Sequence, residues 1–178
     1  MMKFGVLLAV FVTAGISSVQ AHITLESSEA AAGAPYRIVL RVPHGCEGAA
    51  TTKIDVKLPE GIIAAKPMPK AGWQLAITKG TYAREYSFYH GMTLKDGARE
   101  ISWSGGKLPD EYYDEFVIAA FVGKEVPPGP LYFSVKQTCE QGAADWSEIP
   151  AADRDAHALK FPAPVLNVTE PHSHEYKR

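Results

Sequence analysis

The sequence predicts an all-β domain, and three features of the chain support this class. Segments in which apolar and polar residues alternate recur at about the 8–12 residue spacing that is typical of sandwiches and barrels. Turn sequences rich in Gly and Pro, such as Pro59-Glu60-Gly61, separate these segments. No stretch has the 3.6-residue apolar periodicity of a long helix. The expected fold is therefore a sandwich or barrel.

The predicted strands differ in how much of their surface is buried. In the segment Tyr36–Val42 every second residue is apolar, which predicts a strand with one buried face. Residues 116–122 are apolar throughout, as in a strand that is buried on both faces. Residues 142–155 are polar and irregular, and no strand is expected there. Strands are expected at residues 22–27, 36–42, 51–58, 62–65, 73–77, 86–88, 101–103, 116–122, 131–135 and 163–168.

Residues 1–21 have the pattern of a secretory signal peptide. Lys3 precedes the apolar run Phe4–Val12, and small residues occupy Val19-x-Ala21 at the expected cleavage site. Cleavage after Ala21 would give a mature protein that begins with His22. We therefore expect a periplasmic or secreted protein.

The composition of the chain excludes several classes of partner. Lys and Arg total 18 and Asp and Glu total 20, and no basic run is present, so a nucleic-acid partner is not expected. No second apolar stretch approaches the ~20 residues of a membrane-spanning helix. The mature chain is expected to have no membrane span and is long enough to bury the core of one domain.

The sequence contains two cysteines, Cys46 and Cys139. Export to an oxidising compartment predicts that they form a disulfide. The loop that this bond closes is long, so it would constrain the unfolded chain by roughly 4 kcal/mol in the entropy model. The alternative is a thiolate metal site, but the spacing is not that of a C-x-x-C pair.

His22 would carry two nitrogen donors if it became the first residue. The α-amine and a neutral imidazole are both ligands that suit Cu(II) among the common divalent metals. Because the two belong to one residue, binding by the first places the second close to the same ion. This arrangement is known as a histidine brace. The alternative interpretation is that His occupies an ordinary cleavage site by chance.

Copper(II) prefers four ligands in a tetragonal arrangement, so oxygen donors or water must complete the site. Asp114 and Glu115 directly precede the apolar strand at 116–122, and successive side chains of a strand point in opposite directions. We favour Glu115, with Asp114 as the alternative ligand; the competing interpretation is a solvated turn. Trp146 stands alone in a polar segment and is expected either to cap the sandwich or to cover the site.

The remaining histidines carry weaker signals. His44, His90 and His157 are each expected to be structural or solvated, because a lone histidine without a paired spacing is weak evidence for a ligand. The tail, residues 169–178, has no apolar periodicity and is expected to be disordered. It contains His172-x-His174, which is a possible auxiliary metal-binding pair or an incidental one. Trp73 and Trp103 lie in predicted strands and are expected in the core.

Several short motifs occur in a specific order. The mature chain opens with His22-Ile23-Thr24, carries Pro43-His44-Gly45-Cys46, continues through Tyr113-Asp114-Glu115-Phe116, and then has Cys139 and Trp146. In this it resembles the YcnI-like copper-binding domain family. The resemblance implies an immunoglobulin- or fibronectin-like β-sandwich that binds Cu(II) through a single-histidine brace. It also implies the residue roles: His22 and Glu115 as ligands, with Trp146 close to the metal.

The expected function is that of a copper chaperone or carrier in copper acquisition or homeostasis, formed by residues 22–168. The resemblance implies a membrane copper transporter or copper-delivery protein as partner. No catalytic Ser or Cys motif is present, and we do not expect an enzyme. Two alternatives stay open: a copper-dependent oxidative enzyme, which would normally use a second histidine, and a metal-free extracellular interaction domain.

Overall fold

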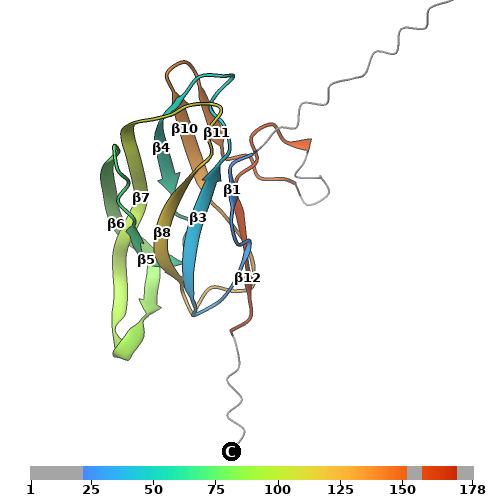
Figure 1. The fold of residues 1–178 in the computed structure, drawn as a ribbon. Helices are drawn as coiled ribbons and strands as arrows, with labels where there is room; N and C mark the ends of the chain where they lie inside the picture. Colours follow the sequence, from blue (N-terminus) through green and yellow to red (C-terminus); the bar gives the residue numbers. More distant parts are fainter. Residues whose placement is uncertain (1–21, 152–157, 172–178) are drawn as a thin grey trace, which may run out of the picture.

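The computed structural model describes residues 22–151 and 158–171. The predicted signal peptide, His157 and the pair His172 and His174 lie outside the described residues. Two antiparallel sheets pack face to face, and a third, three-stranded sheet lies beside them (Figure 1). The described chain is therefore a β-sandwich, as the sequence predicts.

The first sheet has four strands in the order β1-β3-β8-β5. All neighbouring strands in it are antiparallel. Its central strands are the two whose sequences gave the clearest signals of burial. The strands are β1 (Thr24–Leu25), β3 (Pro35–Val42), β8 (Asp114–Val122) and β5 (Ile62–Pro67).

The second sheet has five strands in the order β11-β10-β4-β7-β6, again with antiparallel neighbours. The edge strand β11 of this sheet and the edge strand β1 of the first sheet lie on the same side of the sandwich (Figure 1). The strands are β11 (Ala143–Trp146), β10 (Ser134–Cys139), β4 (Thr51–Lys57), β7 (Thr93–Leu108) and β6 (Gln74–Ser87).

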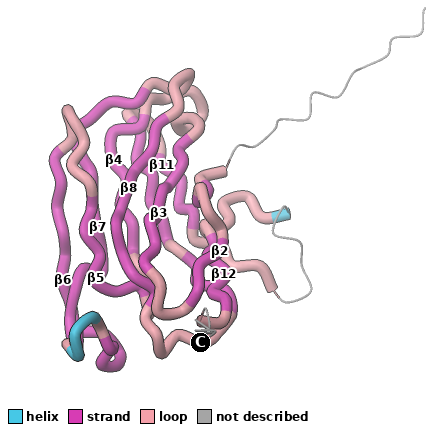
Figure 2. The backbone as a smooth tube through the Cα atoms, turned by 60° about the horizontal axis from the view of Figure 1, so that its bottom comes forward, coloured by secondary structure: helices cyan, strands magenta, loops and turns pink. Residues whose placement is uncertain are grey.

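The third sheet is small and has the order β2-β12-β9. Its strands β2 and β12 are parallel, whereas β12 and β9 are antiparallel. Figure 2 shows β2 and β12 together at one side of the sandwich. The strands are β2 (Glu29–Ala31), β12 (Val165–Thr169) and β9 (Gly129–Tyr132). Strand β12 thus includes Thr169, one residue beyond the predicted domain boundary.

The centre of the core is an aromatic cluster between the two large sheets. Phe116 of β8 packs edge-on against Trp103 of β7, with ring centroids 5.4 Å apart, and against Trp73 at 5.1 Å. The Trp103 indole N–H donates to the carbonyl oxygen of Met68 at 3.1 Å, so this fully buried polar group is satisfied. Trp103 is in the core as predicted, and Trp73 packs against it while remaining partly exposed.

Strands β6 and β7 differ from the prediction of three short strands at 73–77, 86–88 and 101–103. They form one hairpin of 14 and 16 residues. In β6, only Tyr82 and Tyr86 are buried, so most of the strand has no apolar periodicity to detect. A 3-10 turn, η1 (Tyr89–Gly91), lies between the two strands, at the end of the molecule away from β11 (Figure 2).

Strands β2 and β11 were not predicted. The side chains that they bury include Ala31 and Ala144, which are too small to give an alternating hydrophobic signal. Both strands are short and hold their place through pairing with neighbours that are distant in sequence. Among residues 22–151 and 158–171, no helix has the length and hydrophobicity that a membrane crossing requires.

A buried tyrosine gives the fold a test at alkaline pH. The Tyr36 hydroxyl donates to the Ser27 carbonyl oxygen at 2.5 Å, and burial raises the pKa of Tyr36 to about 12 from the ordinary 10.0. The contribution of Tyr36 to the free energy of unfolding is therefore fully present below pH 10. It is lost as the pH rises towards 12, because in this range the unfolded state releases the tyrosine proton and the folded state keeps it. We expect Tyr36→Phe to remove up to about 2 kcal/mol of this decline, measured by urea unfolding at several pH values.

Tyr112→Phe is the matched control, because Tyr112 is 58% exposed. Its unfolding free energy should follow that of the parent protein at every pH. An alkaline decline of equal size in Tyr36→Phe and in the parent would contradict the assignment.

Candidate metal centre

His22 lies at the end of the sandwich where β1 begins and β3 ends. Thr24 pairs with Arg41, and the strands are antiparallel, so the residue at position 22 comes opposite Pro43, just beyond β3. The neighbouring Ile23 is 2% exposed and belongs to the core cluster. Burial of this side chain anchors the segment, so His22 has a defined position on the domain.

Trp146 belongs to strand β11, which corrects the prediction that it lies in a polar loop. Its neighbour Asp145 is exposed whereas Trp146 itself is 2% exposed, so the strand alternates even though its sequence is mostly small and polar. The indole packs edge-on against Phe161, with ring centroids 5.3 Å apart. Trp146 therefore caps one end of the core.

The same indole contacts two histidine rings. The centroid of the His22 imidazole lies 5.7 Å from that of the indole, and the His44 imidazole lies at 6.5 Å. Capping and covering, the two alternatives considered for Trp146, are thus compatible: one part of the indole closes the core and another contacts His22 and His44. His22 directly precedes β1 and His44 follows β3, so both lie at the same end of this antiparallel strand pair.

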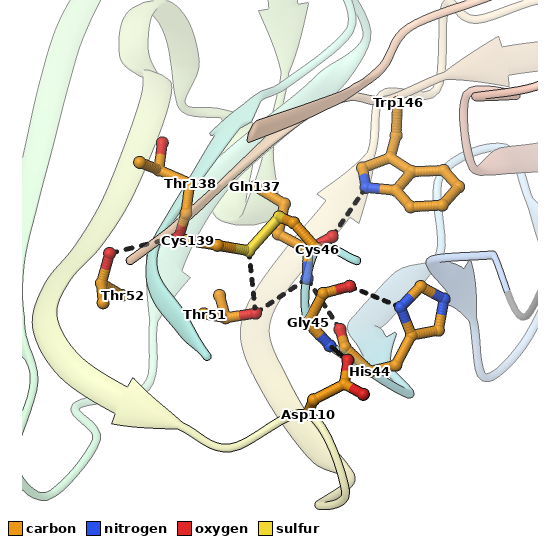
Figure 3. Close-up of a disulfide and its surroundings, with 10 residues drawn as sticks. All are labelled: His44, Gly45, Cys46, Thr51, Thr52, Asp110, Gln137, Thr138, Cys139 and Trp146. Carbon is orange, nitrogen blue, oxygen red and sulfur yellow. Dashed lines mark hydrogen bonds between the residues drawn. A yellow bond between two sulfur atoms is a disulfide. The ribbon is translucent and has the colours of Figure 1, made fainter. Parts of the chain in front are cut away.

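A buried glutamine holds this cluster in place. The Trp146 indole N–H donates to the Gln137 side-chain oxygen at 3.0 Å (Figure 3). The Gln137 amide nitrogen donates in turn to the backbone oxygen of His44 and to the Thr51 hydroxyl, each at 2.8 Å. Gln137 is 1% exposed, so three hydrogen bonds satisfy a side chain that would otherwise be costly to bury.

The loop that carries His44 is tied covalently to the second sheet. Cys46 and Cys139 form the predicted disulfide, with Cα atoms 5.9 Å apart and a separation of 93 positions in sequence. Cys139 is the last residue of β10, the strand that also carries Gln137. The Gly45 N–H also donates to an Asp110 carboxylate oxygen at 2.8 Å. Figure 3 shows His44, Gly45 and Trp146 grouped beside this disulfide.

Glu115, the favoured acidic ligand, lies on the outward face of the first sheet. It pairs with Arg41, which pairs with Thr24, so β3 stands between Glu115 and β1. Two strand spacings place the backbones of Glu115 and Thr24 about 10 Å apart. The Glu115 carboxylate accepts a short hydrogen bond from the Tyr113 hydroxyl and lies 3.9 Å from the Arg41 guanidinium.

Asp114, the alternative acid, lies in the next row of the sheet beside the buried Val42. One of its carboxylate oxygens accepts from the Lys70 ammonium at 2.6 Å and from the Glu115 N–H at 2.8 Å. Both acids are therefore engaged by neighbouring cations. In the described ranges, no three His, Cys, Asp or Glu side chains converge as a metal-binding group.

His90 is in the turn η1, at the other end of the molecule from His22. Its neighbour Tyr89 packs against Phe121 at 5.0 Å, and Phe121 pairs with Pro35, the residue of β3 farthest from the His22 end. The position of His90 separates it from the cluster at Trp146.

A cavity of about 220 Å³ borders the histidine cluster. Its lining includes His44, Cys46, Trp146 and Phe161. This volume has room for several water molecules, and it borders His44 and Trp146 without His22 in its lining.

The nitrogen donors at this end of the sandwich depend on whether the chain is cut before His22. The cut would add an amine next to the imidazole of His22. Side-chain clusters do not include a backbone amine, so a brace is compatible with the lack of a three-residue cluster in the described chain. Amine and imidazole nitrogens form a donor set that suits Cu(II).

Two residues of this region, His44 and Gln137, had no functional role in the sequence prediction. The motif Pro43-His44-Gly45-Cys46 was noticed, but nothing in it shows that the ring reaches Trp146. Gln137 reads as one polar residue of an alternating strand. Gln137 reaches the Trp146 indole because β10 and β11 are paired, with Val135 opposite Trp146. Sequence periodicity does not reveal this pairing.

The fold and the site define an immunoglobulin-like β-sandwich with one disulfide and a cluster of histidine and tryptophan rings at one end. The chain belongs to the family described as Domain of unknown function (DUF1775), whose model matches residues 22–168. The resemblance is thus confirmed as membership of this domain family, and copper binding stays a prediction.

Solved structures support the same fold. An uncharacterized protein from Nocardia farcinica, whose crystal structure reveals an immunoglobulin-like fold, is 24% identical with a TM-score of 0.60. The match covers 83% of this chain and 97% of that one. The immunoglobulin-like sandwich is therefore confirmed.

Two cohesins are more distant. The seventh ScaB type I cohesin of Pseudobacteroides cellulosolvens is 8% identical, with a TM-score of 0.42 and coverage of 88% and 97% of the two chains. The type I cohesin–dockerin complex Coh-OlpA-Doc918 from Clostridium thermocellum matches at 12% and 0.41, with coverage of 83% and 98%. No curated protein is significantly similar in sequence.

The Gln137 network can be tested by stability. In Gln137→Leu the Trp146 N–H, the His44 carbonyl and the Thr51 hydroxyl lose a buried partner. We expect the free energy of unfolding to fall by about 2–4 kcal/mol, measured by urea unfolding. Gln74→Leu, the same change at an exposed residue of β6, is the control and should have almost no effect. Equal effects of both changes would contradict the role of Gln137.

Proposed function

We propose that this protein is a periplasmic or secreted Cu(II)-binding protein that carries copper and hands it to a copper-delivery protein or transporter. The metal is held by the α-amine and imidazole of His22 after removal of residues 1–21. The observation that carries this proposal is the contact of His22 with Trp146, at an anchored chain segment that begins where a signal peptide is expected to end.

The position of the family match supports the same boundary. The family model begins to match at His22, so residues 1–21 lie outside it. The predicted cleavage site and the start of the family domain thus coincide at a residue whose two nitrogens become a chelate on cleavage. An anchored terminus of this kind presents both donors in a fixed direction.

Trp146 supports the proposal through its surroundings. A buried indole beside His22 excludes water from one side of the bound ion and lowers the local dielectric constant, which strengthens metal–ligand interactions. The hydrogen bond from its N–H to Gln137 fixes the ring, so the cover cannot turn away without leaving a buried amide unsatisfied.

An acidic third ligand remains part of the proposal, with Glu115 favoured over Asp114. To bind at His22, Glu115 would exchange its contacts with Arg41 and Tyr113 for the metal. Arg41 also lies 3.2 Å from Glu26, so its charge would keep a carboxylate partner after such an exchange. Water is the alternative donor at this position.

The decisive test moves the amine away from His22. We expect the mature protein beginning at His22 to bind one Cu(II) at least about 100-fold more tightly than the same chain beginning at Ser17. The reason is that the extended chain keeps the imidazole but places the amine five residues away. Binding is measured by competition titration against a copper chelator.

The length of the extension matters in this comparison. An amine one or two residues before a histidine can itself chelate copper with the intervening amides, so a shorter extension would be a poor control. Both proteins should carry His172→Ala and His174→Ala, which removes the tail pair. Equal affinity of the two chains would overturn the brace.

Proton competition gives an independent prediction. Both nitrogens of His22 must lose a proton before they bind copper, and the ordinary pKa values of an α-amine and an imidazole are about 8 and 6.5. The apparent Cu(II) affinity should therefore fall steadily as the pH is lowered from about 8 to 5. Competition titrations at each pH measure this, and a flat profile would contradict nitrogen ligation.

The two alternative functions predict different outcomes, one in an oxygen-consumption assay and the other in the comparison of the two N-termini. An oxidative copper enzyme would consume oxygen when supplied with a reductant, whereas a carrier would hold the metal without turnover. An interaction domain without metal would be indifferent to the extension at His22. We propose carriage, because His22 would provide two ligands and Trp146 a cover, and these roles require no substrate.

A further inference from the structure

The outward face of the first sheet has a groove of about 500 Å³, towards the end of the sandwich opposite His22. Residues of β3, β5 and β8 line it, together with Phe88. At its centre, Ala119 of β8 pairs with Arg37 of β3 on one side and with Lys66 of β5 on the other. Paired residues of antiparallel strands project from the same face of a sheet. Because Ala119 is small and exposed, the space between the two cations is open.

A β-bulge in β5 brings Lys66 to this face. From Ile63 to Lys66, β5 advances by three residues while its partner β8 advances by two. Ala64 lies inside the bulge with a φ of 51°, a left-handed conformation that is strained in a residue other than glycine. Side chains alternate along a strand, so without the extra residue Lys66 would point towards the core. Bulges often redirect a side chain beside a functional site in this way.

An aromatic cluster forms the other part of the groove. The Phe121 ring projects from β8 on the same face as Ala119, two residues farther along the strand. Phe88 and Tyr89 pack edge-on against this ring, with centroids at 5.1 and 5.0 Å. Phe88 and Phe121 line the groove, and Tyr89 is exposed next to them. The groove therefore joins a cationic part to an apolar part.

The charges that line the groove have one sign. Among the residues that the structure describes, its charged lining consists of Arg37 and Lys66, and no acid contributes. Lys66 takes part in none of the ion pairs found within residues 22–151 and 158–171. Arg37 contacts Glu26 at 3.3 Å, but both side chains are well exposed, so this pair is weak and leaves further guanidinium donors for an anion.

From this arrangement we propose that the groove binds one molecule of an amphipathic anion. A carboxylate or phosphate would lie over Ala119, between Arg37 and Lys66. The guanidinium fork matches either group, and lysine adds a second charge. The apolar part of the molecule would pack against the rings of Phe88 and Phe121.

The shape of the groove favours a free molecule over a membrane surface. Its volume is in the range of sites that hold a single small ligand. The two cations lie within one hollow, about two strand spacings or roughly 10 Å apart, and are not spread over a flat surface. The site is separate from His22, so this proposal is independent of copper binding.

The experiment compares two ligands that have the same alkyl chain. The chain beginning at His22, without added metal, is titrated by calorimetry with dodecanoate below its micelle-forming concentration. We expect one dodecanoate per chain, bound at least about 10-fold more tightly than dodecyltrimethylammonium, whose head group is cationic. Lys66→Met removes the charge but keeps an unbranched side chain, and it should weaken dodecanoate binding by at least about 10-fold.

Ala119→Phe is a second variant, which fills the groove and keeps both cations. It should also weaken dodecanoate binding by at least about 10-fold. Lys95→Met is the matched control, because Lys95 is an exposed lysine of β7 outside the groove lining. This control should keep the parent affinity. Near-ultraviolet circular dichroism establishes that each variant is folded, and if Ala119→Phe does not fold, Lys66→Met and the comparison of head groups still decide the question.

Several results would overturn the proposal. One is the absence of dodecanoate binding, and another is equal binding of the two head groups. Dodecanoate binding that is unchanged in Lys66→Met would place the ligand elsewhere on the protein. Binding to phosphatidylglycerol vesicles without binding of free dodecanoate would assign this face to a membrane surface instead.

Discussion

The buried amide of Gln137 is the constraint on which the functional end of the sandwich depends. One side chain connects the indole of β11, the backbone of the His44 loop and the hydroxyl that begins β4. These groups are distant in sequence and meet only because β10 lies between β4 and β11. An apolar residue could fill the space but would leave three polar groups unsatisfied, so the amide fixes their relative positions.

The fold could be predicted from the sequence where the pattern was strong. Strands β3 and β8 were located within two residues because their apolar residues face a core that both sheets share. The β6–β7 hairpin was divided into fragments because most of β6 is exposed and burial leaves no signal there. Strand β11 escaped detection because Ala144 supplies one of its two buried positions, so pairing with β10 rather than composition defines it.

The candidate site could be predicted only in part, for a different reason. The importance of His22 follows from local sequence, since a cleavage pattern and a histidine are adjacent. The partners of His22 depend on which strand edges meet, and a single sequence does not specify that meeting. Trp146 was noticed as an isolated indole, but its contact with His44 depends on how the His44 loop and β11 meet at Gln137. Glu115 was chosen by adjacency to a core strand, which does not reveal that Arg41 lies between it and β1.

The segments at this end of the sandwich differ in how firmly the fold holds them, which would suit the proposed carrier, because a carrier must release its metal. The His44 loop is fixed by the disulfide, Asp110 and Gln137. The His22 segment is joined to the sheet through β1, which pairs with β3 at two residues. Short terminal pairings open at a lower free energy than the core. Under the proposed ligation, opening of β1 would withdraw the amine and the His22 imidazole together while Trp146 stayed in place. An acceptor that competes for the copper would then need to separate only this short strand from the sandwich, and the disulfide-bonded core could remain folded throughout the transfer.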